Sequence, residues 1–319
     1  MRNLTVAQAI ENRKANARGR KYPAHDDERI EDGIVLPVLR PSFAIRPDDR
    51  IFTVGSCFAR NIEQRLEGYD VPTRRFDLPK GEVAGRAVSV LNEYNAGTMA
   101  QRITYAAQGR TFDDRAVIAE GDGYGDLLLA GGKPVAFERL MERRAQVDEL
   151  YALLPRSQVL IVTLGLVEAW YDLESELYIN RAPGPAAFRD PEQSKRYELR
   201  ILDVDDVVSL LQPALEAALG AGLGKIVLTV SPVPLQTTFD DRDVLVANGY
   251  SKAVLRAAAD KLAERIDALD YFPSYEMVTV TANNPYDDDN VHVRNDVVAR
   301  VIRHMLEHYL DTGEIASAA

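Results

Sequence analysis

Cysteine is nearly absent from this sequence, since Cys57 is the only one in 319 residues. A single cysteine excludes an internal disulfide framework and any metal site built from several cysteines. Positive charge is also in the minority, because 38 Lys and Arg stand against 49 Asp and Glu, a net charge of −11. This balance argues against a nucleic-acid partner, which would require clustered basic residues.

Long hydrophobic runs are missing as well. No apolar stretch reaches the ~18 residues of a membrane span. The N-terminal residues MRNLTVAQAI contain no apolar signal core. We therefore expect a cytoplasmic protein without a membrane span; the oligomeric state stays open.

We expect three parts: an N-terminal arm, residues 1–49, a main domain, residues 50–312, and a C-terminal tail, residues 313–319. In the arm, Thr5 is placed to cap a short helix that starts at Val6. The rest of the arm is charged and interrupted by proline. We expect it to lie on the main domain or to be partly disordered.

Strands and helices alternate through the main domain. The strand candidates are continuous apolar runs, typical of strands buried on both faces of a parallel sheet. These strands are predicted at 50–55, 157–164, 225–231 and 276–281, and helices at 59–66, 138–153, 204–219, 248–269 and 296–310. The alternation predicts an α/β fold: a three-layer α/β/α sandwich with a mostly parallel sheet. Residues 108–135 form an irregular or β-hairpin insertion and 173–200 a second insertion. Asn295 is placed to cap the last helix.

Two adjacent nucleophiles follow the first predicted strand. The segment IFTVGSCFAR at 51–60 ends an apolar run in Gly55, continues with Ser56 and Cys57, and then begins a helix. Backbone N–H groups and the helix dipole at such a position favour developing negative charge. This layout suits an enzyme that passes an acyl group through a nucleophile.

Histidine is scarce, and one of the four stands out. His292 directly precedes the last helix, and Asp289 lies three residues earlier. In a turn, the carboxylate accepts a hydrogen bond from one ring nitrogen while the other nitrogen faces a nucleophile. The alternative is a solvated or capping turn. His304 and His308 have the spacing of a metal pair, but we interpret them as surface or flanking residues, and we predict no metal or cofactor.

Several ordered segments resemble the GSCFA family. They are VGSCFA at 54–59, TLGLVEAW at 163–170, TVSPVP at 229–234, YSKAVLR at 250–256, YFPSYE at 271–276 and the Asp289/His292 pair. The resemblance covers roughly residues 50–310. The family is grouped with SGNH-type hydrolases, which implies a flavodoxin-like sheet and esterase or acyltransferase chemistry.

The resemblance also implies roles for individual residues. In SGNH enzymes a Gly-Asp-Ser block carries the nucleophilic serine, and aligning the glycines places Cys57 on that position. Asp289 and His292 match the Asp-x-x-His block. A thiol at a helix N-terminus beside a histidine is expected to have a lowered pKa. The alternative keeps Ser56 as the nucleophile and Cys57 as a buried thiol.

The resemblance assigns the oxyanion and substrate-binding residues less completely than the triad. SGNH enzymes use the nucleophile's own N–H, a glycine N–H and an asparagine, and the glycine of the third block corresponds to Gly165. Valine stands where that block's asparagine is expected, so Asn95 is the candidate amide donor, with a turn as its alternative role. Glu168 and Trp170 follow a strand end and are predicted to face the pocket. Trp170 either stacks on a sugar ring or belongs to the core.

We therefore predict an acyl-transfer enzyme, either an esterase or an O-acyltransferase. Its substrate would be a small-molecule or carbohydrate O-acyl ester, with carbohydrate chosen on family resemblance alone. The alternative is a non-catalytic glycan- or partner-binding module that retains the fold.

Overall fold

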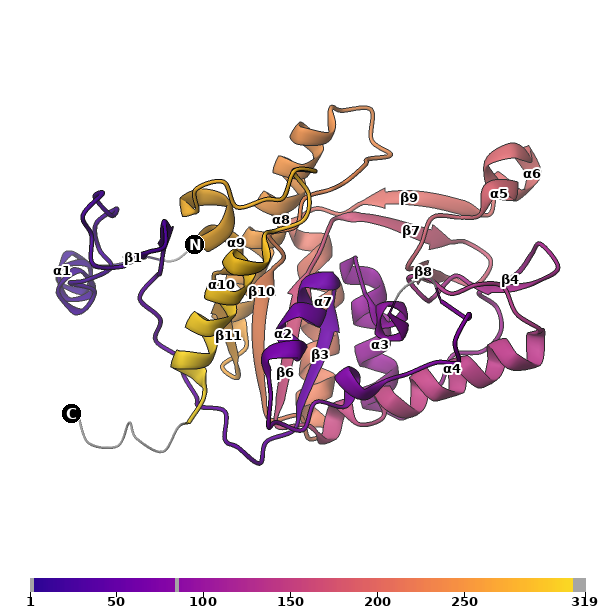
Figure 1. The fold of residues 1–319 in the computed structure, drawn as a ribbon, viewed down its shortest axis with the longest axis horizontal. Helices are drawn as coiled ribbons and strands as arrows, with labels where there is room; N and C mark the ends of the chain where they lie inside the picture. Colours follow the sequence, from indigo (N-terminus) through magenta and orange to yellow (C-terminus); the bar gives the residue numbers. More distant parts are fainter. Residues whose placement is uncertain (1–2, 84–85, 312–319) are drawn as a thin grey trace.

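A four-stranded parallel sheet forms the centre of the fold (Figure 1). The computed structural model describes residues 3–83 and 86–311. The strand order is β11-β10-β6-β3. The strands are β3 (Ile51–Gly55), β6 (Val159–Leu164), β10 (Lys225–Val230) and β11 (Leu269–Phe272). Their carboxyl ends meet at one edge, where Gly55 pairs with Thr163 and Thr163 with Thr229.

Helices cover both faces of this sheet because its side chains alternate between two cores. Phe52 and Val54 belong to one core, together with side chains of four helices, whereas Ile51 belongs to the other. The first core contains α3 (Ala96–Gln108), α4 (Phe137–Tyr151), α7 (Val204–Gly220) and α8 (Val244–Arg265). The second contains α2 (Cys57–Arg65) and α10 (Asn295–Tyr309). The predicted three-layer α/β/α sandwich is confirmed.

One predicted strand is wrong. Residues 276–281 are helical: α9 (Ser274–Glu276) continues into a π-helical turn, η4 (Met277–Thr281). The β-branched residues of this segment favour a strand, but β11 already occupies the edge of β10. Met277 and Val278 instead pack into the second core. The capping role of Asn295 is also wrong, since Arg294 occupies the N-cap position without a side-chain cap.

The two insertions carry additional sheet structure. The first, 108–135, contains the predicted hairpin of β4 (Val117–Glu120) and β5 (Gly123–Asp126). β7 (Glu168–Asp172) pairs antiparallel with β8 (Leu177–Ile179) and with β9 (Tyr197–Ile201). Two short helices, α5 (Pro185–Arg189) and α6 (Pro191–Ser194), lie between β8 and β9. Three 3-10 turns complete the connections: η1 (Pro72–Arg75), η2 (Ala87–Leu91) and η3 (Leu154–Arg156).

The N-terminal arm lies partly on the domain. Its helix α1 (Val6–Ala15) starts at the predicted cap Thr5 but has no buried residue, and it lies at the edge of the molecule (Figure 1). After the short pair β1 (Ile30–Glu31) and β2 (Ile34–Val35), Ile45 packs into the second core. The predicted tail, 313–319, lies outside the described residues. In the described part of the chain, no helix combines the length and hydrophobicity needed to cross a bilayer.

Candidate active site

The turn between β3 and α2 positions the two candidate nucleophiles. Gly55 ends β3 with a φ of +149°, and a Cβ at this position would lie 2.5 Å from the carbonyl oxygen of Thr163. Only glycine fits such a close approach. Ser56 then occupies the N-cap position and Cys57 is the first residue of α2. Cys57 is therefore at a strand end and a helix N-terminus, as the sequence predicts.

Cys57 and Ser56 differ in exposure. Cys57 is partly exposed, whereas Ser56 is 4% exposed and its Oγ has no hydrogen-bond partner among the described residues. Burial raises the pKa of the Cys57 thiol; the backbone N–H groups of Phe58 and Cys57 and the charges of Lys252 and Arg60 oppose this rise without reversing it. The expected lowering of the thiol pKa is thus wrong, because desolvation outweighs the helix N-terminus.

A tight loop before α10 presents His292. The Asp289 carboxylate accepts hydrogen bonds from the N–H groups of Val291 and His292, both at 2.9 Å, and lies 2.5 Å from His292 Nδ1. The hydrogen bond with His292 is the main reason that the pKa of Asp289 falls to about 2. The pairing at Nδ1 leaves Nε2 as the ring nitrogen available to accept a proton. The loop is tied to the end of β10 by the Tyr286 hydroxyl, which donates to the Pro232 carbonyl at 3.1 Å.

One cavity brings Cys57 and His292 together. It has a volume of about 400 Å³ and opens at the carboxyl ends of β3, β6 and β10. Its wall includes Ser56, Cys57, Gly165, Ser231 and His292, and the rest is formed by Tyr94, Leu166, Val233, Pro234, Leu235, Gln236, Thr237 and Val291. The predicted nucleophiles, the predicted histidine and the predicted glycine therefore share one site.

A second cavity, of about 260 Å³, is lined by three more of the predicted site residues, Asn95, Glu168 and Trp170. Asp289 lines neither cavity and is connected to the first one through its contact with His292. Tyr94, Leu166, Leu235 and Thr237 line both cavities, so the two are contiguous.

The side chains of the second cavity have structural partners. Asn95 caps α3 by accepting the Thr98 N–H at 2.9 Å. Glu168 accepts hydrogen bonds from Thr238 and, at 3.0 Å, from the Phe239 N–H, and so holds the loop after β10. Asn95 thus caps a helix instead of forming a turn, and it is absent from the wall of the cavity that contains Cys57.

Trp170 belongs to an aromatic cluster at this cavity. Its ring lies edge-on to Phe188 and to Phe239, with centroids 5.9 and 5.2 Å apart. Phe188 and Phe239 stack on each other and are 56% and 51% exposed. Exposed aromatic rings beside a cavity provide apolar surface to a ligand.

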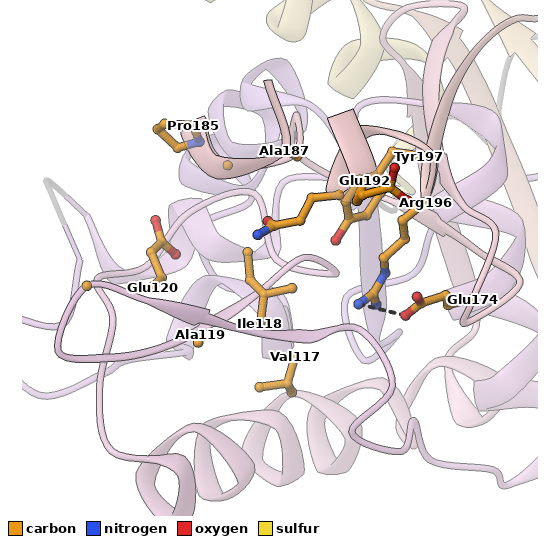
Figure 2. Close-up of a pocket in the computed structure, with 13 residues that line it drawn as sticks. Val117, Ile118, Ala119, Glu120, Glu174, Pro185, Ala187, Glu192, Arg196 and Tyr197 are labelled. Carbon is orange, nitrogen blue, oxygen red and sulfur yellow. Dashed lines mark ion pairs between the residues drawn. The ribbon is translucent and has the colours of Figure 1, made fainter. Parts of the chain in front are cut away.

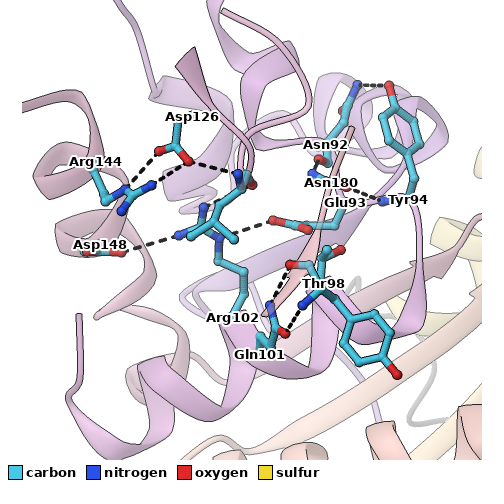
Figure 3. Close-up of polar contacts among 12 residues, drawn as sticks. Asn92, Glu93, Tyr94, Thr98, Gln101, Arg102, Asp126, Arg144, Asp148 and Asn180 are labelled. Atoms are coloured by element: carbon cyan, nitrogen blue, oxygen red, sulfur yellow. Dashed lines mark hydrogen bonds and ion pairs between the residues drawn. The ribbon is translucent and has the colours of Figure 1, made fainter. Parts of the chain in front are cut away.

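A buried polar network supports the segment beside the cavity (Figure 3). Glu93 lies 3.3 Å from Arg102, both almost fully buried, and burial raises the pKa of Glu93 to about 7 despite this partner. Arg102 also contacts Asp148 at 3.4 Å. Asn180 accepts the Tyr94 N–H at 3.2 Å. This network, which anchors Tyr94 in the wall of both cavities, was not predicted from the sequence.

A larger cavity, of about 810 Å³, has a separate set of lining residues (Figure 2). It is formed between the β4–β5 hairpin and the α5–α6 segment. Among its charged groups, Arg196 and Glu174 form an ion pair at 3.0 Å. None of the predicted site residues lines it, so its size alone assigns no function.

The paired histidines of α10 are not both on the surface. His304 is buried and its Nε2 lies 2.8 Å from the Pro37 carbonyl, so the prediction of a surface residue is wrong for His304. His304, Glu307 and His308 are the one group of potential metal ligands that comes together among residues 3–83 and 86–311. However, His308 Nδ1 is paired with the His304 carbonyl at 2.9 Å.

Three residues of the site were missed or undervalued by the sequence analysis. Tyr94 lines both cavities, and Ser231 lines the one with Cys57. Lys252 is buried behind that cavity and donates to the Gly165 carbonyl at 2.7 Å. Position after a strand signals Ser231. Lys252 lies in the YSKAVLR segment, but nothing local gives it or Tyr94 a place at the site, because tertiary contacts bring both there.

The fold and site define an α/β/α protein with a candidate nucleophile and a His–Asp pair at the carboxyl edge of a parallel sheet. The sequence profile of the GSCFA family matches residues 50–305, and the chain belongs to this family. No curated protein matches it.

Among solved structures, the chain is similar to Axe2, an acetylxylan esterase from Geobacillus stearothermophilus. A catalytic variant of that enzyme is 9% identical, with a TM-score of 0.35, and the match covers 85% of this chain and 100% of that chain. A second Axe2 structure is 11% identical, with a TM-score of 0.32, over 83% and 97% of the two chains.

Proposed function

We propose that this protein is an acyl-transfer enzyme that uses Cys57 as its nucleophile. The observation that carries the proposal is the 400 Å³ cavity lined by both Cys57 and His292, with Asp289 holding the imidazole. The greater exposure of Cys57 favours it over Ser56. The grouping of the GSCFA family with SGNH-type hydrolases points to the same chemistry.

In the proposed reaction His292 Nε2 takes the proton of the Cys57 thiol, and the sulfur attacks the carbonyl carbon of an ester. A base is needed because the raised pKa keeps the thiol protonated near neutral pH. The imidazolium, stabilised by Asp289, then gives its proton to the leaving alkoxide, which leaves a thioester on Cys57. Backbone N–H groups in the first turn of α2 are candidate donors to the tetrahedral oxyanion.

Release of the acyl group decides the type of enzyme. Attack by water makes the protein an esterase, and attack by a hydroxyl of a second substrate makes it an O-acyltransferase. An O-acylated carbohydrate is the proposed substrate, supported by the family resemblance and by Trp170 and Phe239 in the wall of the contiguous cavity.

Hydrolysis of p-nitrophenyl acetate tests the proposal. Cys57→Ala and His292→Ala should each lower kcat/KM by about 10³-fold or more. Brief incubation of the wild type with substrate should leave an acetyl group on the peptide that contains Cys57. If Ser56→Ala were inactive while Cys57→Ala kept wild-type activity, Ser56 would be the nucleophile. Wild-type turnover in all three variants would reject the proposal that the protein is an enzyme of this type.

A further inference from the structure

Two of the three rings in the aromatic cluster line the second cavity. Trp170 comes from β7, and Phe239 comes from the loop between β10 and α8. Phe188 of α5 stacks on Phe239 and extends the apolar surface beyond the cavity. About half of the surface of Phe188 and of Phe239 is exposed, so both rings forgo part of the free energy that burial provides. A ligand that covers these rings recovers that free energy.

Polar side chains complete the wall of the same cavity. Asn180, Arg181 and Thr237 line it, and Thr237 also lines the cavity that contains Cys57. The neighbouring Gln236 lines the Cys57 cavity. The side chains of Thr237 and Gln236 are exposed and form no hydrogen bond within the described part of the chain, so both can meet polar groups of a ligand.

The loop that carries these groups is held in place at both ends. The Glu168 carboxylate accepts hydrogen bonds from the Thr238 hydroxyl and, at 3.0 Å, from the Phe239 N–H. The Leu235 N–H donates to Asn248 Oδ1 of α8 at 3.0 Å. A binding surface that is fixed before the ligand arrives loses less conformational entropy on binding.

We infer that the second cavity is a subsite for a pyranose ring, one face of which lies on Trp170 and Phe239. The hydroxyl groups of the sugar meet Thr237 and Gln236, and the acyl group that it carries enters the contiguous cavity with Cys57. A pyranose offers both C–H faces for aromatic rings and hydroxyl groups for polar side chains, whereas an apolar acyl group would cover the polar side chains without a hydrogen bond. The placement of the acyl group rests on the proposed function, but sugar binding is tested without catalysis.

The test is the intrinsic fluorescence of the wild-type protein, because Trp170 is the only tryptophan and lines the subsite. Titration with the methyl pyranosides of glucose, galactose, mannose and xylose should give a saturable change in emission with at least one of them. Phe239→Ala should weaken this binding by about fivefold or more, and its backbone N–H still donates to Glu168. Tyr124→Ala is the matched control, because the Tyr124 ring is 40% exposed, lies edge-on to Phe137 and lines neither cavity; its Kd should stay at the wild-type value.

A second variant distinguishes a sugar from an acyl chain. Thr237→Val retains the shape of the side chain without its hydroxyl, so pyranoside binding should weaken by about two- to tenfold. A change in emission with octanoate and with none of the four pyranosides would assign the subsite to the acyl group and overturn the inference. Dimerisation that Phe239→Ala abolishes, in a protein that responds to no pyranoside, would assign the rings to an interface between copies and also overturn it.

The subsite and the proposed function can fail separately. Pyranoside binding by a protein that hydrolyses no ester would retain the subsite and reject the proposed enzyme. Ester hydrolysis by a protein whose Trp170 emission responds to no pyranoside would retain the enzyme and overturn the subsite. If both hold, Phe239→Ala should lower kcat/KM for an O-acetylated pyranose by more than it lowers kcat/KM for p-nitrophenyl acetate.

Discussion

Replacing Lys252 by methionine should change how stability depends on pH. Because of burial, the pKa of the amine falls from its ordinary 10.5 to about 7 in the folded protein. Below pH 7 both states bind the proton, and the folded state carries the full cost of a buried ammonium. Between pH 7 and pH 10.5 the unfolded state holds a proton that the folded state has released, so this group makes stability rise with pH. Above pH 10.5 both states are neutral and the cost is gone.

The size of the effect follows from that difference in pKa. About 3.5 pH units correspond to about 5 kcal/mol of destabilisation below pH 7, of which about 2 kcal/mol is recovered between pH 7 and pH 9. No discount for solvent screening applies, since the side chain is 1% exposed. Methionine removes this cost and leaves the Gly165 carbonyl without its donor, a loss of about 1–3 kcal/mol that does not depend on pH. The variant should therefore be the more stable protein at pH 7 and lose about 2 kcal/mol of that advantage by pH 9.

Urea unfolding followed by far-UV circular dichroism at pH 7, 8 and 9 measures the difference. Three proteins should be compared: a Cys57→Ser parent, whose thiol cannot titrate, and this parent with Lys252→Met or with Lys261→Met. The Lys261→Met control should run parallel to the parent, since the exposed ion pair of Lys261 with Asp205 contributes about 0–1 kcal/mol. Parallel curves for the parent and Lys252→Met would show that Lys252 stays charged in the folded protein, and the reasoning from burial would fail.

Three further variants test the site and its support. Asp289→Asn should lower kcat on p-nitrophenyl acetate by at least about tenfold, because the imidazolium loses its counter-charge; unchanged kcat would remove the carboxylate from the mechanism. Gly55→Ala should lower the urea midpoint by the equivalent of about 3 kcal/mol, since a Cβ would meet the Thr163 carbonyl at 2.5 Å; a wild-type midpoint would contradict the observed turn. Arg144→Met should lower the free energy of unfolding by about 3–5 kcal/mol, because it removes the guanidinium that lies 2.6 Å from the buried Asp126 carboxylate. A loss below about 1 kcal/mol would contradict this.

The central strands were predictable because their runs are apolar on both faces. Residues 51–55, 159–164 and 225–230 are strands as expected. The helical conformation of 276–281 was not predictable, because its local β propensity favours a strand, whereas residues 269–272 already occupy that edge of the sheet. Sequence alone does not show which of two neighbouring segments pairs first.

Helix α3 was missed although the sequence carries its signals. Asn95 is a good N-cap, and the apolar residues Ala96, Met99, Ala100 and Ile103 follow at helical spacing and are all buried. The Ala-Gly after Asn95 was instead interpreted as a turn. Gly97 serves close packing, since a Cβ there would lie 2.2 Å from the Tyr178 ring.

The candidate site was predictable where it depends on strand ends. Cys57, Gly165 and Ser231 line one cavity because the ends of parallel strands meet at one edge, which the alternation of strands and helices predicts. His292 follows no strand; its loop is tied to the end of β10 by the hydrogen bond from Tyr286 to the Pro232 carbonyl, which the sequence does not show. The thiol pKa was not predictable, because desolvation depends on what the folded chain places over the sulfur. Lys252 also escaped prediction, since its position in the middle of a helix is equally compatible with full exposure.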